Sequence, residues 1–320
     1  MYDVISLGEL LIDFACIGQD AYGYPTMQAH PGGAVANFLG AVAKFGGRTA
    51  LLGKVGNDAF GKLLLNTLRE NKIDVSGMLE TDEYFTTLAF VTFDKNGERD
   101  FSFSRKPGAD TQYSAEELDP KFIADSKVFH FGTLSLTDPC SRAATKKAIE
   151  IAEQNGCILS LDPNLRPPLW NSLSEAKAQI LWAMGHADIL KISDNEVEFL
   201  FGDISPEAAT ERILNEFKPS LVYLTMGSKG CFYRTKNCSG FVPALTGLKV
   251  VDTTGAGDIF GGSAMFRFLQ FGKKPEYLTD AELREIVTFA TCAAGLSVTK
   301  PGGISGIPEL QEVLRKVSEL

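Results

Sequence analysis

One stretch in the last quarter of the chain concentrates residues that could do chemistry. It reads DTTGAGDIFGG, from Asp252 to Gly262, and it places four glycines around a single carboxylate, Asp258. Glycine clusters are typical of loops in which the backbone must approach another group closely. Apolar residues follow at helical spacing, beginning with Ile259 and Phe260. The pattern therefore predicts that this loop opens a helix.

A helix that starts here would present the free N–H groups of residues 255–258 at its positive end. Such groups can hold the negative oxygens of a phosphoryl group in transfer, while a neighbouring carboxylate accepts the proton of an attacking hydroxyl. The helix dipole also predicts that Asp258 is ionised, because it favours the charged form. From the residues alone an alternative stays equally open, in which Asp258 caps the helix and the glycines only turn the chain.

Two glycine patterns resemble nucleotide-binding motifs but are better explained otherwise. GNDAFGKL, from Gly56 to Leu63, nearly matches a phosphate-binding loop, yet Leu63 stands where that motif needs Ser or Thr. Asn57 or Asp58 is instead expected to cap the helix that follows. The glycines at 255, 257 and 261 resemble a dinucleotide fingerprint. In a dinucleotide site, however, the charge of Asp258 would repel the pyrophosphate. The strand with a terminal acidic residue that completes such a site also does not follow.

Strand and helix patterns alternate along most of the chain. Such alternation predicts right-handed βαβ units and a mostly parallel sheet with helices on both faces. The expected strands are residues 3–9, 49–55, 127–132, 157–162, 187–193 and 221–227. The expected helices are residues 34–46, 59–71, 141–156, 174–185, 206–218 and 256–272.

Two segments break this alternation. Residues 86–104 read as two alternating runs joined by Asn96-Gly97, which is a strong hairpin signal. A second irregular insertion covers about residues 13–32. Together they are expected to form a small β-sheet lid above the parallel core. The predicted α/β core domain comprises residues 1–12, 33–84 and 111–320, and the discontinuous lid comprises 13–32 and 85–110.

Bulk composition excludes several classes of protein. The 320 residues carry a net charge of −9, so the chain lacks the excess of basic residues that nucleic-acid binding needs. The start has no basic signal-peptide region, and no uncharged apolar run approaches membrane-spanning length. Six scattered cysteines and three separated histidines favour reduced thiols and no zinc site. We therefore expect a cytoplasmic protein with neither nucleic-acid nor membrane partners.

With these motifs in hand, the sequence resembles a known family. DTTGAGD is similar to the C-terminal signature of the pfkB, or ribokinase-like, carbohydrate kinases, and residues 31–61 resemble the N-terminal signature. The resemblance covers essentially the whole chain. It implies a ribokinase-like three-layer α/β/α sandwich with a β lid. It also implies transfer of the ATP γ-phosphoryl group to a sugar hydroxymethyl group, assisted by Mg²⁺.

The resemblance assigns roles to residues of both signatures. Asp258 matches the catalytic base of the family. The anion hole matches Gly255, Ala256 and Gly257. Asp13 matches an aspartate that binds sugar hydroxyls, although alone it could be a strand-end turn residue. The floor of the sugar pocket matches Gly32, Gly33 and Asn37, since glycines allow close approach and the amide can hold hydroxyls.

Within the family, LDPNLRPPLW and FSFSRKPGAD resemble fructokinases most. Arg105 and Arg166 are then candidates to anchor the sugar or the transferring phosphate, because a guanidinium group is planar and always charged. Each could equally be a surface charge. Phe101 and Phe103 could cover the apolar face of the sugar or fill the interior of the lid.

The nucleotide site is expected around LTMGSKG, which resembles the ATP-binding strand and turn of the family. The candidate contacts are Thr225, Gly227, Ser228 and Gly230, and a tight turn between strands is the alternative for Ser228. Thr291 stands where relatives often have Asn near the adenine, so no base contact is assigned to it.

The resemblance also implies metal ions. Glu196 matches a glutamate that acts near Mg²⁺ through water, with Ser193 standing where many relatives have Asn. Asp252 and Thr254, with backbone around Gly303, resemble the K⁺ site of some members. Because Ser193 departs from the family pattern, the full set of residues that bind the metal ions stays open.

The sequence therefore predicts an ATP-dependent sugar kinase whose acceptor is fructose. Alternative acceptors are 2-keto-3-deoxygluconate, ribose or a nucleoside, and a non-catalytic sugar sensor of the same fold is a further alternative. The exposed edge of the lid suggests that two copies pair through it as a homodimer.

Overall fold

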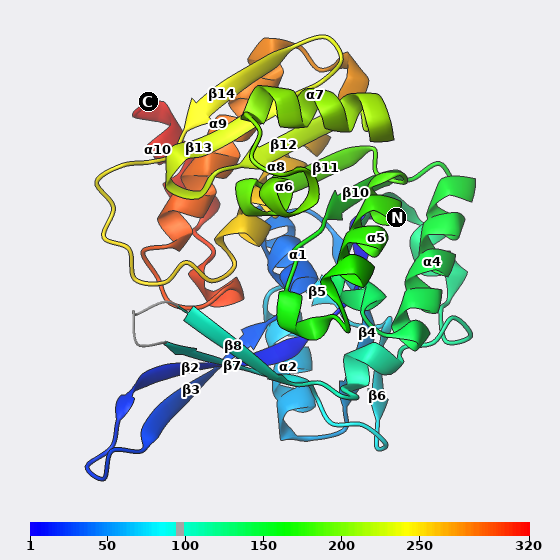
Figure 1. The fold of residues 1–320 in the computed structure, drawn as a ribbon, viewed down its shortest axis with the longest axis vertical. Coiled ribbons are helices and arrows are strands. Elements are labelled where there is room, and N and C mark those ends of the chain that lie inside the picture. The colour runs from blue at the N-terminus through cyan, green and yellow to red at the C-terminus, as the bar shows by residue number, and fades with distance from the viewer. Residues whose placement is uncertain (94–98) are drawn as a thin grey trace.

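Within residues 1–93 and 99–320, which the computed structural model describes, ten strands form one large sheet (Figure 1). Their order is β14-β13-β12-β11-β10-β9-β1-β4-β5, and β6 pairs with β4. The strands are β1 (Tyr2–Leu7), β4 (Thr49–Gly56), β5 (Ile73–Asp74), β6 (Met78–Thr81), β9 (Ser126–Gly132), β10 (Ile158–Asp162), β11 (Ile189–Ser193), β12 (Leu221–Thr225), β13 (Gly230–Arg234) and β14 (Ser239–Pro243).

The strand directions confirm the predicted mostly parallel sheet. Every neighbouring pair from β12 through β11, β10, β9, β1 and β4 to β5 is parallel. Only β13 and β14 add antiparallel partners, at the β12 edge. The six strands expected from the sequence correspond to β1, β4, β9, β10, β11 and β12.

Helices cover both faces of this sheet, which confirms the three-layer α/β/α prediction. Successive side chains of a strand point to opposite faces. On β1, Val4 accordingly packs with one apolar cluster, and Ile5 and Leu7 with another. The first cluster includes residues of α1 (Ala34–Lys44), α2 (Ala59–Glu70), α8 (Ala256–Gln270), α9 (Asp280–Ser297) and α10 (Leu310–Ser318). The second includes residues of α3 (Pro120–Ala124), α4 (Pro139–Gln154), α5 (Leu173–Met184), α6 (Asp194–Phe201) and α7 (Pro206–Phe217).

A second, smaller sheet stands away from the body, at the lower left of Figure 1. It contains β2 (Leu11–Gln19), β3 (Pro25–Gly32), β7 (Leu88–Phe93) and β8 (Arg99–Ser104), in the order β3-β2-β7-β8. The expected small sheet and the antiparallel pairing of β7 with β8 are confirmed. The Asn96-Gly97 turn lies outside the described residues, and the exact domain boundaries stay a prediction.

The cysteines and the buried histidine have the structural roles expected of them. All six cysteines are free thiols. His130 is buried and stacks on Phe38, with 3.6 Å between the ring centroids, and burial lowers its pKa to about 3. In the described part of the chain, no helix combines the length and the apolar character that crossing a bilayer requires.

The motif that nearly matches a phosphate-binding loop is a helix start, as expected from Asp58. Asp58 is the N-cap of α2, and its Oδ1 accepts hydrogen bonds from the backbone N–H groups of Phe60 and Gly61 at 2.9 and 2.8 Å. Its Oδ2 also accepts from the Thr86 N–H at 2.8 Å, just before β7. Burial acts to raise the pKa of Asp58, but the hydrogen bonds from Thr86 and Gly61 outweigh it and the pKa is lowered.

Replacing this cap should weaken the fold. We expect Asp58→Ala to lower the free energy of unfolding by about 1–3 kcal/mol, the cost of a lost cap together with unsatisfied N–H groups. Urea unfolding followed by circular dichroism measures it, with the exposed Asp203→Ala as control.

The Asp58 contribution should depend on pH in a defined direction. Its pKa in the folded state lies below the ordinary value of 3.8. The stabilisation is therefore complete above that value and disappears as the pH falls below it. Equal stability of Asp58→Ala and the unchanged protein at neutral pH would contradict the capping role.

Candidate functional site

The carboxylate of Asp258 is buried and fixed by two amide groups. Asn37 Nδ2 on α1 donates to Oδ2, and Asn164 Nδ2 after β10 donates to Oδ1, both at 2.9 Å. The N-cap of α8 is Gly255, whose φ of 75° favours glycine. Asp258 therefore does not cap the helix, and the alternative that it does so is wrong.

Asp258 is predicted to be ionised, and its pKa stays below neutral pH although burial shifts it upward. Burial raises its pKa to about 6, while the Asn37 hydrogen bond and the nearby Lys191 and Arg166 oppose the rise. The helix dipole was expected to favour the charged form, but removing the carboxylate from water outweighs that effect. The group is still ionised at neutral pH, and a pKa near the working pH suits a general base.

A cavity of about 150 Å³ opens beside Asp258, and we call it the Asp13 cavity. Its mouth includes Phe103 from the lid strand β8. The structure brings most of the predicted acceptor-binding residues together here, which suits a small polar molecule held by convergent side chains. The predicted site residues that line it are Asp13, Gly33, Asn37, Arg166, Gly255 and Asp258.

Two consecutive glycines let the lid strand β2 approach this cavity. A side chain at Gly32 would overlap the carboxylate of Asp13, and one at Gly33 would overlap the carbonyl of Glu9. Gly33 also has a φ of 123°, which few other residues adopt. Gly32 thus acts through its lack of a side chain, next to the cavity.

Asp13 itself has a shifted pKa. Burial raises the pKa of Asp13 to about 6, and the positive charge of Arg166 opposes this rise.

Three further polar residues belong to the site and were not singled out from the sequence. Asn164 has a positive φ of 49°, which Asn tolerates, and this turn aims its amide at Asp258. Its position two residues before the candidate Arg166 could have marked Asn164 as a site residue in the sequence. Glu9 is buried and accepts a hydrogen bond from the Ala34 N–H at 2.6 Å, at the start of α1. Lys191 on β11 is the third.

A second cavity, of about 450 Å³, lies on the other side of the α8 N-terminus, and we call it the Thr225 cavity. Thr253 lines both cavities, so the two adjoin at the start of α8. Apolar side chains such as Leu245, Val250 and Phe260 cover much of its wall. The predicted nucleotide and anion-hole residues that line it are Thr225, Gly227, Ser228, Gly230, Ala256 and Gly257.

The LTMGSKG stretch forms the tight turn between strands that was one interpretation, and contact of this turn with ATP stays a prediction. Residues Gly227–Lys229 form a tight turn between the antiparallel strands β12 and β13, and the same turn lines the Thr225 cavity. Thr291 lines it too, and its buried Oγ1 has no hydrogen-bond partner within the described residues.

Glu196 is already engaged by the protein. Its Oε1 accepts from the Leu165 N–H at 2.8 Å, and its Oε2 accepts from the N–H and hydroxyl of Ser193, both at 2.8 Å. Ser193 is the N-cap of α6 and forms a capping box with Glu196, which explains a serine at this position.

Among the described residues, no three His, Cys, Asp or Glu side chains are arranged to hold a metal ion. Mg²⁺ commonly keeps several waters and uses one or two carboxylates plus substrate phosphates. Glu196 fits that mode of binding, and its role toward Mg²⁺ stays a prediction.

The predicted K⁺ residues lie together in one loop. Asp252 Oδ1 accepts from the N–H and hydroxyl of Thr254 at 2.9 and 2.8 Å, and its Oδ2 accepts from the Gly302 N–H at 2.9 Å. The neighbouring Gly303 packs so closely on Asn37 that any side chain would overlap the amide. Oxygen ligands for K⁺ are thus close to the site, and the ion itself stays a prediction.

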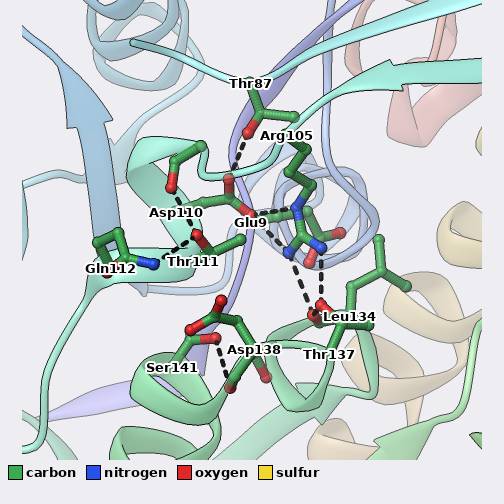
Figure 2. Close-up of polar contacts among 12 residues, drawn as sticks. Glu9, Thr87, Arg105, Asp110, Thr111, Gln112, Leu134, Thr137, Asp138 and Ser141 are labelled. Carbon is green, nitrogen blue, oxygen red and sulfur yellow. Dashed lines mark hydrogen bonds and ion pairs between the residues drawn. The ribbon is translucent and has the colours of Figure 1, made fainter. Parts of the chain in front are cut away.

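Arg105 does not reach the Asp13 cavity, contrary to its predicted role in anchoring the acceptor. Figure 2 shows its guanidinium group inside a polar cluster at the base of the lid. Its Nε donates to Asp110 Oδ2 at 2.8 Å, Nη1 to the Thr137 hydroxyl at 2.7 Å, and Nη2 to the Leu134 carbonyl at 3.1 Å. Thr87, before β7, also donates to Asp110. Arg105 therefore ties the lid to the core, and it borders a separate cavity of about 580 Å³.

The chain is similar to known proteins over nearly its full length. Residues 1–310 match the model described as "pfkB family carbohydrate kinase". The chain is 41% identical to Fructokinase-1 of Zea mays over 322 residues, which covers 99% of this chain and 98% of the relative.

Solved structures agree with the sequence comparison. A putative ribokinase II from E. coli, in complex with ATP and Mg²⁺, has a TM-score of 0.88 and 29% identity, covering 100% of both chains. A fructokinase double mutant from Vibrio cholerae O395, with fructose, ADP and potassium bound, has a TM-score of 0.86 and 30% identity, covering 98% of both chains. The fold is thus ribokinase-like, as the sequence predicted.

The two arginines should differ in their effect on stability. Arg105→Met should lower the free energy of unfolding by about 3–5 kcal/mol, because it leaves the buried Asp110 carboxylate without its partner. Arg166 is half-buried, and within the described residues its hydrogen bond is to the Leu165 carbonyl, so Arg166→Met should lower the free energy of unfolding by less than about 1 kcal/mol. Urea unfolding measures both.

The double variant Arg105→Met/Asp110→Asn serves as the control for this comparison. It removes both charges of the pair and should recover much of the loss. Equal costs for the two single arginine variants would show that Arg105 does not tie the lid to the core.

Proposed function

The chain belongs to the pfkB family of carbohydrate kinases and is an ATP-dependent sugar kinase, and we propose that it phosphorylates the 6-hydroxymethyl group of fructose. The observation that carries the proposal is the position of Asp258. Its carboxylate lies at the Asp13 cavity, and the N-terminus of the same helix lies between this cavity and the Thr225 cavity. A base and an anion-binding helix end therefore meet where an acceptor and a phosphoryl donor would adjoin.

In this proposal the chain's own groups carry out the proton transfer. The amides of Asn37 and Asn164 hold the Asp258 carboxylate in a fixed orientation. Asp258 then takes the proton of the sugar hydroxyl as that oxygen bonds to the γ-phosphorus, while the bond from the γ-phosphorus to the bridging oxygen breaks and ADP leaves. The N–H groups of Gly255 and Gly257 receive the negative charge of the transferring group, and the Ala256 N–H joins them by sharing or giving up its 3.3 Å hydrogen bond to the Thr253 carbonyl. Bound Mg²⁺ supplies charge neutralisation on the ATP phosphates, with Glu196 acting toward it through water.

The acceptor is proposed to bind in the Asp13 cavity. Asp13 and Asn37 offer a carboxylate and an amide for sugar hydroxyls, and Arg166 adds a fixed positive charge. Phe103 from the lid covers the opening. Closing the lid over the sugar would exclude water, which otherwise competes as a phosphoryl acceptor.

The Thr225 cavity is the proposed ATP site. Its apolar wall suits a nucleobase, and the turn at Gly227, Ser228 and Gly230 offers backbone and hydroxyl groups. The loop at Asp252 and Thr254 is the proposed K⁺ site, supported by the potassium ion in the V. cholerae fructokinase structure.

A panel of acceptors tests the choice of substrate. ADP release with ATP should give the highest kcat/KM for fructose, compared with ribose, 2-keto-3-deoxygluconate and a nucleoside. A higher kcat/KM for another acceptor would reassign the substrate within the family. Stabilisation by fructose in a thermal-shift assay without any ADP release would favour the sugar-sensor alternative.

We also propose that two copies pair through the lid in the cytoplasm. Ile17, Tyr22 and Tyr24 on the lid are 60, 87 and 68% exposed, and β3 and β8 are edge strands. Six free thiols suit a reducing compartment. Sedimentation velocity that finds only monomers at micromolar concentration would argue against the dimer.

Removing the proposed base should affect turnover far more than binding. Asp258→Asn should lower kcat by about 10²–10⁴-fold, because the amide cannot accept the hydroxyl proton. The fructose KM should stay close to that of the unchanged enzyme. Steady-state kinetics measures both, with the exposed lid variant Asp20→Asn as control. Turnover within a few-fold of the unchanged enzyme would remove Asp258 from the role of base.

The rate should also report the raised pKa of Asp258. Since only the ionised carboxylate can act as base, kcat should fall as the pH drops below about 6. The decline should approach tenfold per pH unit. A pH profile of kcat at saturating fructose and ATP measures it, and an acidic limb near the ordinary aspartate value of 3.8 would contradict the assignment.

A further inference from the structure

Lys191 on β11 places a nearly buried ammonium group directly behind the start of α8. Its Nζ donates to Asp162 Oδ2 at 2.9 Å, and its side chain is only 12% exposed. A Cβ atom on Gly257 would lie 3.1 Å from this Nζ. The ammonium group therefore lies close to the backbone of the proposed anion hole, and a side chain at residue 257 would press against it.

Charged groups around Lys191 keep it cationic. Burial acts to lower its pKa, but Asp162, Glu196 and Asp258 together outweigh burial and the pKa is raised. The buried His130 nearby has its pKa lowered to about 3 and is therefore neutral. A single positive charge thus sits among three carboxylates beneath the N-terminus of α8.

We propose that Lys191 is a positioning residue for phosphoryl transfer, which adds fixed positive charge behind Gly257 and steadies the ionised form of Asp258. This inference rests on the proposed kinase function. Charge develops on the transferring phosphoryl group, and a cation already held in place stabilises that charge without reorganisation. The small residue at 257 is then needed as much for the approach of Lys191 as for the approach of phosphate.

A purely structural role for Lys191 makes a different prediction. Lys191 and Asp162 form a buried ion pair, and removing one member of such a pair destabilises a fold whatever the pair does for function. A loss of activity in Lys191→Met alone would therefore be ambiguous. Removing both charges together separates the two roles, because it relieves the unpaired carboxylate without restoring the ammonium group.

The experiment compares Lys191→Met with Lys191→Met/Asp162→Asn. We expect Lys191→Met to lower kcat by about 10–10²-fold, less than the 10²–10³-fold seen when a direct donor is lost. The fructose KM should stay within about threefold. In the double variant the melting temperature should recover while kcat stays low. Recovery of both melting temperature and kcat in the double variant would overturn the proposal.

Lys54 offers a matched control. It is also a buried lysine paired with a carboxylate, since its Nζ donates to Glu117 Oε1 at 2.6 Å, and it is not among the residues that line either cavity. Lys54→Met should lower the melting temperature and leave kcat within about twofold. A loss of kcat in Lys54→Met equal to that in Lys191→Met would mean that any broken buried pair suffices.

A readout independent of turnover completes the test. Besides Lys191, several polar and charged groups act on Asp258, including Asn37, Asn164, Arg166, Glu9, Asp13 and Asp162. The carboxyl ¹³C resonance of Asp258 in the unliganded protein should titrate at higher pH in Lys191→Met than in the unchanged protein. An unchanged titration would overturn the proposal. If the protein without any substitution phosphorylated no sugar, that result would instead overturn the proposed function, whatever the titration shows.

Discussion

The burial of one carboxylate between two amides is the constraint on which the site depends. Asp258, Asn37 and Asn164 come from α8, α1 and the turn after β10, so their two hydrogen bonds join parts of the chain that are far apart in sequence. Each amide satisfies one oxygen that would otherwise be buried without a partner. Any shift of α1 against α8 would therefore misplace the base, and the tight packing of Gly262 against Phe38 opposes such a shift.

The architecture could be anticipated because short apolar runs, as strands buried on both faces require, alternate with amphipathic helical patterns along the chain. The parallel strands from β1 to β12 are apolar runs separated by helices with clear caps, and such runs are recognised without knowledge of their partners. β13 and β14 were not anticipated. β13 is a short, mostly buried strand and β14 is mostly exposed, so neither shows an alternating pattern, and their antiparallel pairing is decided by the sheet edge beside them.

The residues that line the candidate site were singled out through the family resemblance, because the spacing of the glycines and Asp258 alone left a capping role equally open. An arginine is harder to place, since it can serve many partners. Arg105 was therefore assigned to the acceptor, although Asp110 and Thr137 hold it inside the fold. The pKa of Asp258 could not be foreseen for a related reason. Desolvation depends on what surrounds a group in space, and neighbours in sequence report only the helix dipole.

The two cavities draw their walls from different stretches of the chain. The Asp13 cavity is lined mainly by residues between 9 and 37, by 103 and by 164–166, whereas the Thr225 cavity is lined by residues between 225 and 298. They share only Thr253 and the start of α8. If the Asp13 cavity holds the acceptor and the Thr225 cavity holds ATP, as proposed, substitutions in the lid and the first helix can change the accepted sugar while the donor site stays intact. Proteins with this fold could therefore evolve different acceptor preferences while they keep the same donor site.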